Sequence, residues 1–165
     1  MILNDGFRSL LSHLPLPILI QVVTYYKKTR KNISQINQFS VDKNGIPFVN
    51  YGKIFGKNIG KQRNPVVISQ YALKYFENFE KDDNNKHKFH LLNCVNWFLE
   101  NGVKNNDAVF LEYNFPWPKY NLEKPWRSGM AQGLAIQALV KVHKISKEDK
   151  FLILQNYCLI HSILR

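Results

Sequence analysis

Cysteine, acidic side chains and long apolar runs are all scarce in this sequence. Its 165 residues include two cysteines, Cys94 and Cys158, and no C-x-x-C arrangement. Both cysteines lie in apolar helical patterns, which indicates a reduced protein with two core thiols and excludes a fold built on disulfides or a cysteine-type zinc site. The longest apolar run, Leu14 to Val23, contains two prolines and is too short to cross a bilayer.

The first residues also lack the basic region of a secretory signal. We therefore expect a cytoplasmic protein without a transmembrane segment. Residues 6–30 carry an apolar stripe at helical spacing, so a peripheral position on a membrane surface is an alternative. Packing of this stripe against the rest of the chain is the favoured explanation.

Because Asp and Glu are few, the chain is strongly basic. There are 23 Lys and Arg residues against 12 Asp and Glu, which gives a net charge of +11. Such a surface favours acidic polysaccharide, nucleic acid or anionic lipid. The cations are spread along the chain, however, and a solvated surface explains much of the charge equally well. Nucleic acid is disfavoured because no recognition motif is present and the aromatic residues gather in one proline-rich loop.

The length and the hydrophobic content of 45% predict one ordered domain of moderate size. Apolar spacing predicts four helices, over residues 64–81, 86–101, 128–143 and from 146 onward. Residues 31–63 are polar and glycine-rich and are expected to form an ordered loop, and residues 108–111 a short extended segment. The predicted fold class is all-α, made of helical hairpins.

A proline-rich aromatic loop precedes the third predicted helix, within residues 113–133. Pro116, Pro118 and Pro125 each remove a backbone donor and exclude regular structure in its first half. Ser128 is the expected N-cap of the helix that follows, because its hydroxyl can accept an N–H of the first turn.

This loop is the candidate ligand site. Flat rings suit the apolar face of a sugar, and a guanidinium beside a helix N-terminus suits a carboxylate. The expected substrate-binding residues share this loop or the first turn after it: Lys119, Tyr120, Trp126, Arg127, Ser128 and Gln132.

The residue chemistry alone favours a purely structural loop, and two of these residues have specific structural explanations. Arg127 could instead pair with Glu112 or Glu123, and Gln132 could be a buried amide that bonds the loop backbone. Tyr113 is expected to form part of the wall. No catalytic residue is assigned.

No metal or cofactor is expected. His87 and His90 lie three residues apart on a predicted helix, but no third ligand is near them in the sequence.

Two segments resemble one enzyme family. The eight residues from Trp126 to Gly133, WRSGMAQG, resemble the W-x-S-x-M-A-Q-G signature of the D-glucuronyl C5-epimerase C-terminal domain. The ten residues from Asn64 to Leu73, NPVVISQYAL, resemble that family's N-P-x-x-I-A-Q-Y-x-L segment. The resemblance runs from about Gly45 to the end of the chain. It implies that residues 45–165 are the first part of the epimerase helical domain, and residues 1–44 are expected from their own pattern to be an N-terminal helical segment with a polar linker.

The resemblance also implies a fold and a function. The fold would be part of an α/α toroid, and the activity would be epimerisation of glucuronate to iduronate in a heparosan-like polysaccharide. The family's catalytic tyrosines lie in segments beyond those aligned here, so we expect a truncated or split relative that is inactive alone. The alternative is a noncatalytic helical module that binds an anionic glycan or a partner chain, either a second copy or a complementing protein.

Overall fold

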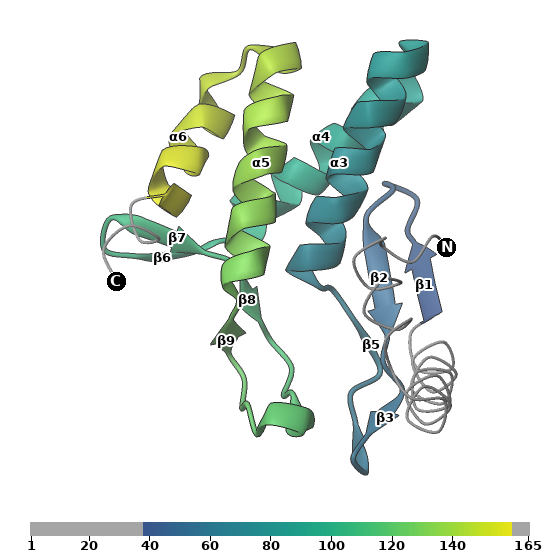
Figure 1. Cartoon of the computed structure of the whole chain (residues 1–165), viewed down its shortest axis with the longest axis vertical. Coiled ribbons are helices and arrows are strands. Elements are labelled where there is room, and N and C mark those ends of the chain that lie inside the picture. Colours follow the sequence, from purple (N-terminus) through teal and green to yellow (C-terminus); the bar gives the residue numbers. More distant parts are fainter. Residues whose placement is uncertain (1–37, 160–165) are drawn as a thin grey trace, which may run out of the picture. The chain divides into compact units, whose positions relative to one another are not determined.

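Two helical hairpins form the centre of the structure, a computed structural model that describes residues 38–159 (Figure 1). The first hairpin is α3 (Pro65–Asp82) and α4 (Asn85–Asn101), and the second is α5 (Gly129–Ser146) and α6 (Asp149–Leu159). The prediction of a helix within residues 6–30 lies outside the described residues. The domain boundary at residues 44 and 45 stays a prediction.

The expected all-α class is wrong, because short antiparallel strands accompany the helices. The strands are β1 (Gln38–Val41), β2 (Pro47–Asn50), β3 (Lys53–Ile54), β4 (Lys57–Asn58), β5 (Lys61–Gln62), β6 (Val103–Asn105), β7 (Ala108–Phe110), β8 (Glu112–Tyr113) and β9 (Trp126–Arg127). Strand β2 pairs with both β1 and β5, and the pairs β3–β4, β6–β7 and β8–β9 are separate. The described residues therefore have a mixed helix and strand class.

The segment expected to be a loop, residues 31–63, contains five of these strands. Gly45 and Gly56 both have φ of +79°, a left-handed conformation that lets the chain reverse between short strands. The sequence did not predict this pairing, because strands of two to four residues are too short to show an alternation of apolar and polar positions.

The helix boundaries follow the capping residues of the sequence. Asn64 caps α3 by accepting a hydrogen bond from the Val67 N–H at 3.2 Å, and Pro65 occupies the first turn. Ser128 caps α5, as predicted. The fourth helix begins later than predicted: Ser146 ends α5, and Lys147 then adopts φ of +59° before α6 starts at Asp149.

The two hairpins enclose the larger core. Its fully buried large side chains include Phe76, Leu91, Phe98, Leu139 and Phe151. Burying each one stabilises the fold by about 1.5–3 kcal/mol relative to exposure. A second, smaller core lies beneath the loops and contains Val49, Tyr51, Ile59, Tyr113, Phe115 and Ala131.

Helices α3 and α5 lie side by side and run in the same direction (Figure 1). Each is the first helix of its hairpin, so their N-termini lie at the same end of the unit. The long connection from α4 to α5, which holds β6 to β9, lies at that end as well. That the hairpins form part of an α/α toroid stays a prediction.

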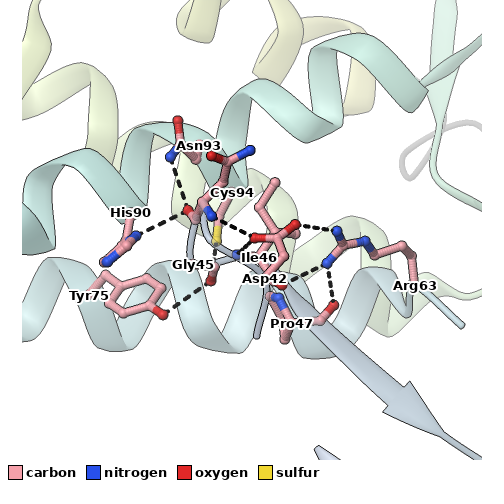
Figure 2. Close-up of polar contacts among 10 residues, drawn as sticks. Asp42, Gly45, Ile46, Pro47, Arg63, Tyr75, His90, Asn93 and Cys94 are labelled. Carbon is pink, nitrogen blue, oxygen red and sulfur yellow. Dashed lines mark hydrogen bonds and ion pairs between the residues drawn. The ribbon is translucent and has the colours of Figure 1, made fainter. Parts of the chain in front are cut away.

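The turn between β1 and β2 is fastened to the first hairpin by a network of polar contacts (Figure 2). Arg63 pairs with the Asp42 carboxylate and donates to the backbone carbonyls of Ile46 and Pro47, at 2.6 and 3.0 Å. Burial raises the pKa of Asp42, but the hydrogen bonds from Arg63, Ile46 and Asn44 outweigh it and hold the pKa below the ordinary 3.8. Asp42 is therefore a carboxylate at neutral pH.

The same turn also accepts hydrogen bonds from both helices. The Tyr75 hydroxyl of α3 donates to the Gly45 carbonyl at 3.1 Å. From α4, Asn93 donates to the Asn44 carbonyl at 2.9 Å, and His90 Nδ1 lies 3.0 Å from the same oxygen. The turn is thus held at a fixed position against α3 and α4.

Replacement of Gly45 by Ala is expected to destabilise the fold by about 3 kcal/mol. Part of the cost is the left-handed φ, roughly 1 kcal/mol for a residue with a Cβ. The rest arises because the new Cβ would overlap the His90 ring, which is itself bonded to Asn44.

Gly56 provides the matched control, since it has the same φ but nothing within 4 Å of its Cβ position. Gly56→Ala should cost only about 1 kcal/mol, for the backbone term alone. Urea unfolding midpoints measure both changes, and equal losses would contradict the fastened turn.

Candidate functional site

The proline-rich aromatic loop is a short hairpin with a helical turn at its tip. Strands β8 and β9 pair Glu112 with Arg127 and Tyr113 with Trp126. The prolines keep the rest irregular: residues Pro118–Tyr120 form a single 3-10 turn, and Trp117 and Leu122 close it through backbone bonds of 2.8 and 3.2 Å. Strand β9 then leads directly into α5.

Stacked aromatic rings make this hairpin rigid. The rings of Tyr113 and Trp126 stack with their centroids 3.8 Å apart and their planes 8° apart. Phe115 meets both rings edge-on, and its carbonyl accepts a hydrogen bond from the Trp126 indole at 2.7 Å. The satisfied indole N–H and the interlocked rings fix the direction in which the loop presents Trp117 and Trp126.

Four neutral polar side chains gather where this hairpin meets the N-termini of α3 and α5. Asn64, the N-cap of α3, donates through its amide nitrogen to the Tyr51 hydroxyl at 2.5 Å. Its amide oxygen accepts from the Tyr113 hydroxyl at 3.3 Å. Ser128, the N-cap of α5, lies within reach of the same Tyr113 hydroxyl and lowers its pKa slightly by hydrogen bonding.

These groups line a pocket of about 180 Å³ at the shared N-terminal end of α3 and α5. Its lining combines aromatic rings with the four polar side chains: Tyr51, Asn64, Val66, Tyr113, Phe115, Trp117, Trp126 and Ser128. No charged side chain is among them. The pocket is suited to a small ligand with one apolar face and several hydroxyl groups.

Both tyrosines of the pocket are neutral at physiological pH. Burial raises the pKa of Tyr113 to about 12, and burial also raises the pKa of Tyr51 despite its bond with Asn64. A phenol in this state donates and accepts hydrogen bonds but does not remove protons from carbon. Epimerisation by a tyrosinate would require the opposite shift.

Two of the six predicted binding residues, Trp126 and Ser128, line the pocket. Lys119 and Tyr120 lie at the exposed tip of the hairpin, where the ammonium group lies 5.1 Å from the centre of the tyrosine ring. Neither is among the residues that line the pocket, so a ligand there would reach them only by extending outward. Their roles in binding stay predictions.

Arg127 and Gln132 make the structural contacts that the sequence offered as alternatives. Arg127 donates twice to Glu112, at 2.7 and 2.9 Å, and its guanidinium lies 3.8 Å from the centre of the Phe110 ring. Gln132 accepts from the Leu111 N–H at 2.8 Å and donates to the Val109 carbonyl at 2.9 Å. Arg127 thereby joins β9 to β8, and Gln132 joins α5 to β7 and to Leu111.

Sequence reasoning missed Tyr51, Asn64 and Val66 as pocket residues. A signal was present, because each of the two family-like segments contains a helix N-cap, Asn64 in one and Ser128 in the other. Parallel first helices would place both caps at one end. Tyr51 carried no such signal, since its position depends on the pairing of short strands.

Residues 38–159 contain no candidate site for metal binding or for thiol chemistry. No group of three or more His, Cys, Asp or Glu side chains could hold a metal ion in this range. Burial raises the pKa of Cys94 to about 12 and that of Cys158 to about 11, so both are inert core thiols. None of the described helices is both long and apolar enough for a membrane span.

Comparison with known proteins confirms the family resemblance over part of the chain. Residues 104–161, which include the aromatic hairpin, α5 and α6, match the family described as the D-glucuronyl C5-epimerase C-terminus. A curated relative is the uncharacterized protein MJ1128 of Methanocaldococcus jannaschii, 27% identical over 145 residues. That match covers 79% of this chain and 45% of the relative. No solved structure matches the chain.

The pair of Glu112 and Arg127 should prove important for stability. Glu112 is only 10% exposed at its side chain, so Arg127→Ala would leave a nearly buried carboxylate without its partner. We expect that change to cost about 2 kcal/mol, and Glu112→Gln to recover part of the loss when added to it.

The exposed pair of Lys150 and Glu148, 2.7 Å apart with both side chains about half exposed, is the control. A double-mutant cycle there should give a coupling energy near zero, below about 0.5 kcal/mol. Additive losses at Glu112 and Arg127 as well would contradict a structural role for the first pair.

Proposed function

We propose that residues 38–159 bind a uronic-acid-containing polysaccharide of heparosan type, with one ring of the chain in the aromatic pocket. The observation that carries this proposal is the pocket itself, a set of stacked rings and neutral hydroxyl groups at the shared N-terminal end of α3 and α5. The family match of residues 104–161 supports a glycan as the ligand.

Cations around the pocket supply attraction for the acidic groups of such a chain. Lys53 and Lys57 lie on β3 and β4, and Lys119 and Lys124 lie on the aromatic hairpin. Lys57 also forms an exposed ion pair of 3.2 Å with Glu123, which joins β4 to the hairpin. With a net charge of +11, binding should be steered by charge and weakened by salt.

The proposal is binding without epimerisation by this chain alone. Inversion at C5 needs a base on one face of the sugar, an acid on the other and cations to stabilise the carboxylate as it develops charge. Tyr51 and Tyr113 are both held neutral, and no cation lines the pocket with them. The relation to the epimerase family therefore concerns substrate binding in this proposal.

A second candidate function is assembly with another chain, either a second copy or a complementing protein. It is favoured by Leu152 and Ile153 of α6, which are 39% and 54% exposed while Phe151 and Leu154 are buried. Exposed apolar side chains on α6 suit contact with a helix of another chain. The cytoplasmic location expected from the sequence stays a prediction.

Loss of lysines beside the pocket should weaken binding of heparosan oligosaccharides more than loss of lysines elsewhere. The double change Lys119→Gln and Lys124→Gln is expected to raise Kd by up to about thirtyfold at low salt, because each exposed ion pair contributes at most about 1 kcal/mol. Isothermal titration calorimetry at two salt concentrations measures it.

The matched control is Lys144→Gln with Lys147→Gln, at the opposite end of the 18-residue helix α5. That end is about 27 Å away, beyond the Debye length of roughly 10 Å at 0.1 M salt. Equal losses from both double variants would mean nonspecific charge attraction and would count against the pocket.

The chain alone should not exchange the C5 proton of glucuronyl residues with solvent. Heparosan incubated with the protein in D2O and followed by NMR is expected to show no incorporation, because both pocket tyrosines stay protonated far above neutral pH. The double variant Tyr51→Phe and Tyr113→Phe sets the background. Deuterium uptake clearly above that background would show that the pocket itself is catalytic.

A further inference from the structure

The pocket offers only uncharged groups to a ligand. Its polar side chains are the Tyr51, Tyr113 and Ser128 hydroxyls and the Asn64 amide. The remaining lining residues are apolar or aromatic. A carboxylate in such surroundings would lose its hydration without gaining a charged partner, which is costly.

Nearby cations are committed to other partners. Arg127, which lies between the pocket residues Trp126 and Ser128, forms two hydrogen bonds with Glu112 and does not line the pocket. Lys57 pairs with Glu123 on the outside of the hairpin, with both side chains more than half exposed. Neither group is positioned to neutralise an anion between the pocket rings.

Helix N-termini attract anions, and two of them adjoin this pocket, so they need separate consideration. The Val67 N–H of α3 already donates to the Asn64 side chain at 3.2 Å, and the Ala131 N–H of α5 to the Ser128 hydroxyl at 3.5 Å. The Val66 backbone is in turn hydrogen-bonded to the Tyr113 hydroxyl. The free amide groups of both first turns are thus partly satisfied within the protein.

The pocket has a volume of about 180 Å³ and opens to solvent, so it can hold one ring while the rest of a bound chain extends outside it. Trp117 and Trp126 provide an apolar wall for one face of that ring, and the hydroxyl and amide groups can bond its rim.

We propose that this pocket is a subsite for an uncharged, hydroxyl-bearing pyranose ring of the polysaccharide, and that the uronate carboxylates stay outside it. This inference rests on the proposed function for the polymer but differs in what it says of the pocket. Acidic groups would then be met only by the exposed lysines of β3, β4 and the hairpin tip, where they remain hydrated.

The test compares two probes, a heparosan oligosaccharide and the same oligosaccharide with its carboxylates reduced to alcohols. Calorimetry measures both against the wild-type chain at low and at physiological salt. We expect the reduced oligosaccharide to bind with a Kd that salt does not change, and native heparosan to bind more tightly at low salt only.

Variants that remove single hydroxyls then locate the binding. Tyr113→Phe and Tyr51→Phe keep the rings and should weaken both probes alike, by about fivefold each, the usual worth of a neutral hydrogen bond. Tyr75→Phe is the matched control, since it removes a partly buried tyrosine hydroxyl that bonds Gly45 away from the pocket. It should leave both affinities unchanged.

The outcomes separate the two proposals. Binding of native heparosan without binding of the reduced form, or a Tyr113→Phe loss confined to the native form, overturns the uncharged subsite and leaves the proposed function standing. Binding of the reduced form alone overturns the proposed function and supports the subsite. Failure of both probes to bind overturns both.

Discussion

The side chain of Asn64 connects the three parts of the structure on which the candidate site depends. Its oxygen caps α3 through Val67 and accepts from Tyr113 of the aromatic hairpin, while its nitrogen donates to Tyr51 from the strand segment. An amide can accept two hydrogen bonds at its oxygen while its nitrogen donates a third. Without it, two buried tyrosine hydroxyls and a helix N-terminus would lose hydrogen-bond partners together.

Local signals in the sequence were sufficient for the boundaries of α3 and α4 and for the start of α5. Asn64 before Pro65, Ser128 before a small-residue helix and Gly102 after α4 mark boundaries through bonds within one turn, so a reader of the sequence can place them. The strands depend on partners that are distant along the chain, such as Asn50 with Lys61, and runs of two to four residues give no periodic pattern. That difference explains why the all-α prediction was wrong.

The residues of the candidate site show the same difference between local and long-range signals. Trp126 and Ser128 lie in a recognisable segment and line the pocket, whereas Tyr51 reaches it only through tertiary folding. Arg127 was predicted to bind a ligand carboxylate because of its residue type. The pairing of β8 with β9 instead places Glu112 opposite it, so the carboxylate comes from the protein. A ligand carboxylate and a salt bridge with the protein were both compatible with the sequence, because the partner of Arg127 depends on strand register.

The most direct test of the pocket uses the three tryptophans of the chain, Trp97, Trp117 and Trp126. Trp117 and Trp126 line the pocket, and Trp97 lies on α4 against the core of the helical hairpins. Protein labelled with 5-fluorotryptophan gives one ¹⁹F NMR signal for each, assigned by single Trp→Phe changes. On titration with a heparosan oligosaccharide, the account predicts shifts of the Trp117 and Trp126 signals and a constant Trp97 signal. Binding seen by calorimetry with neither pocket signal moving would contradict it.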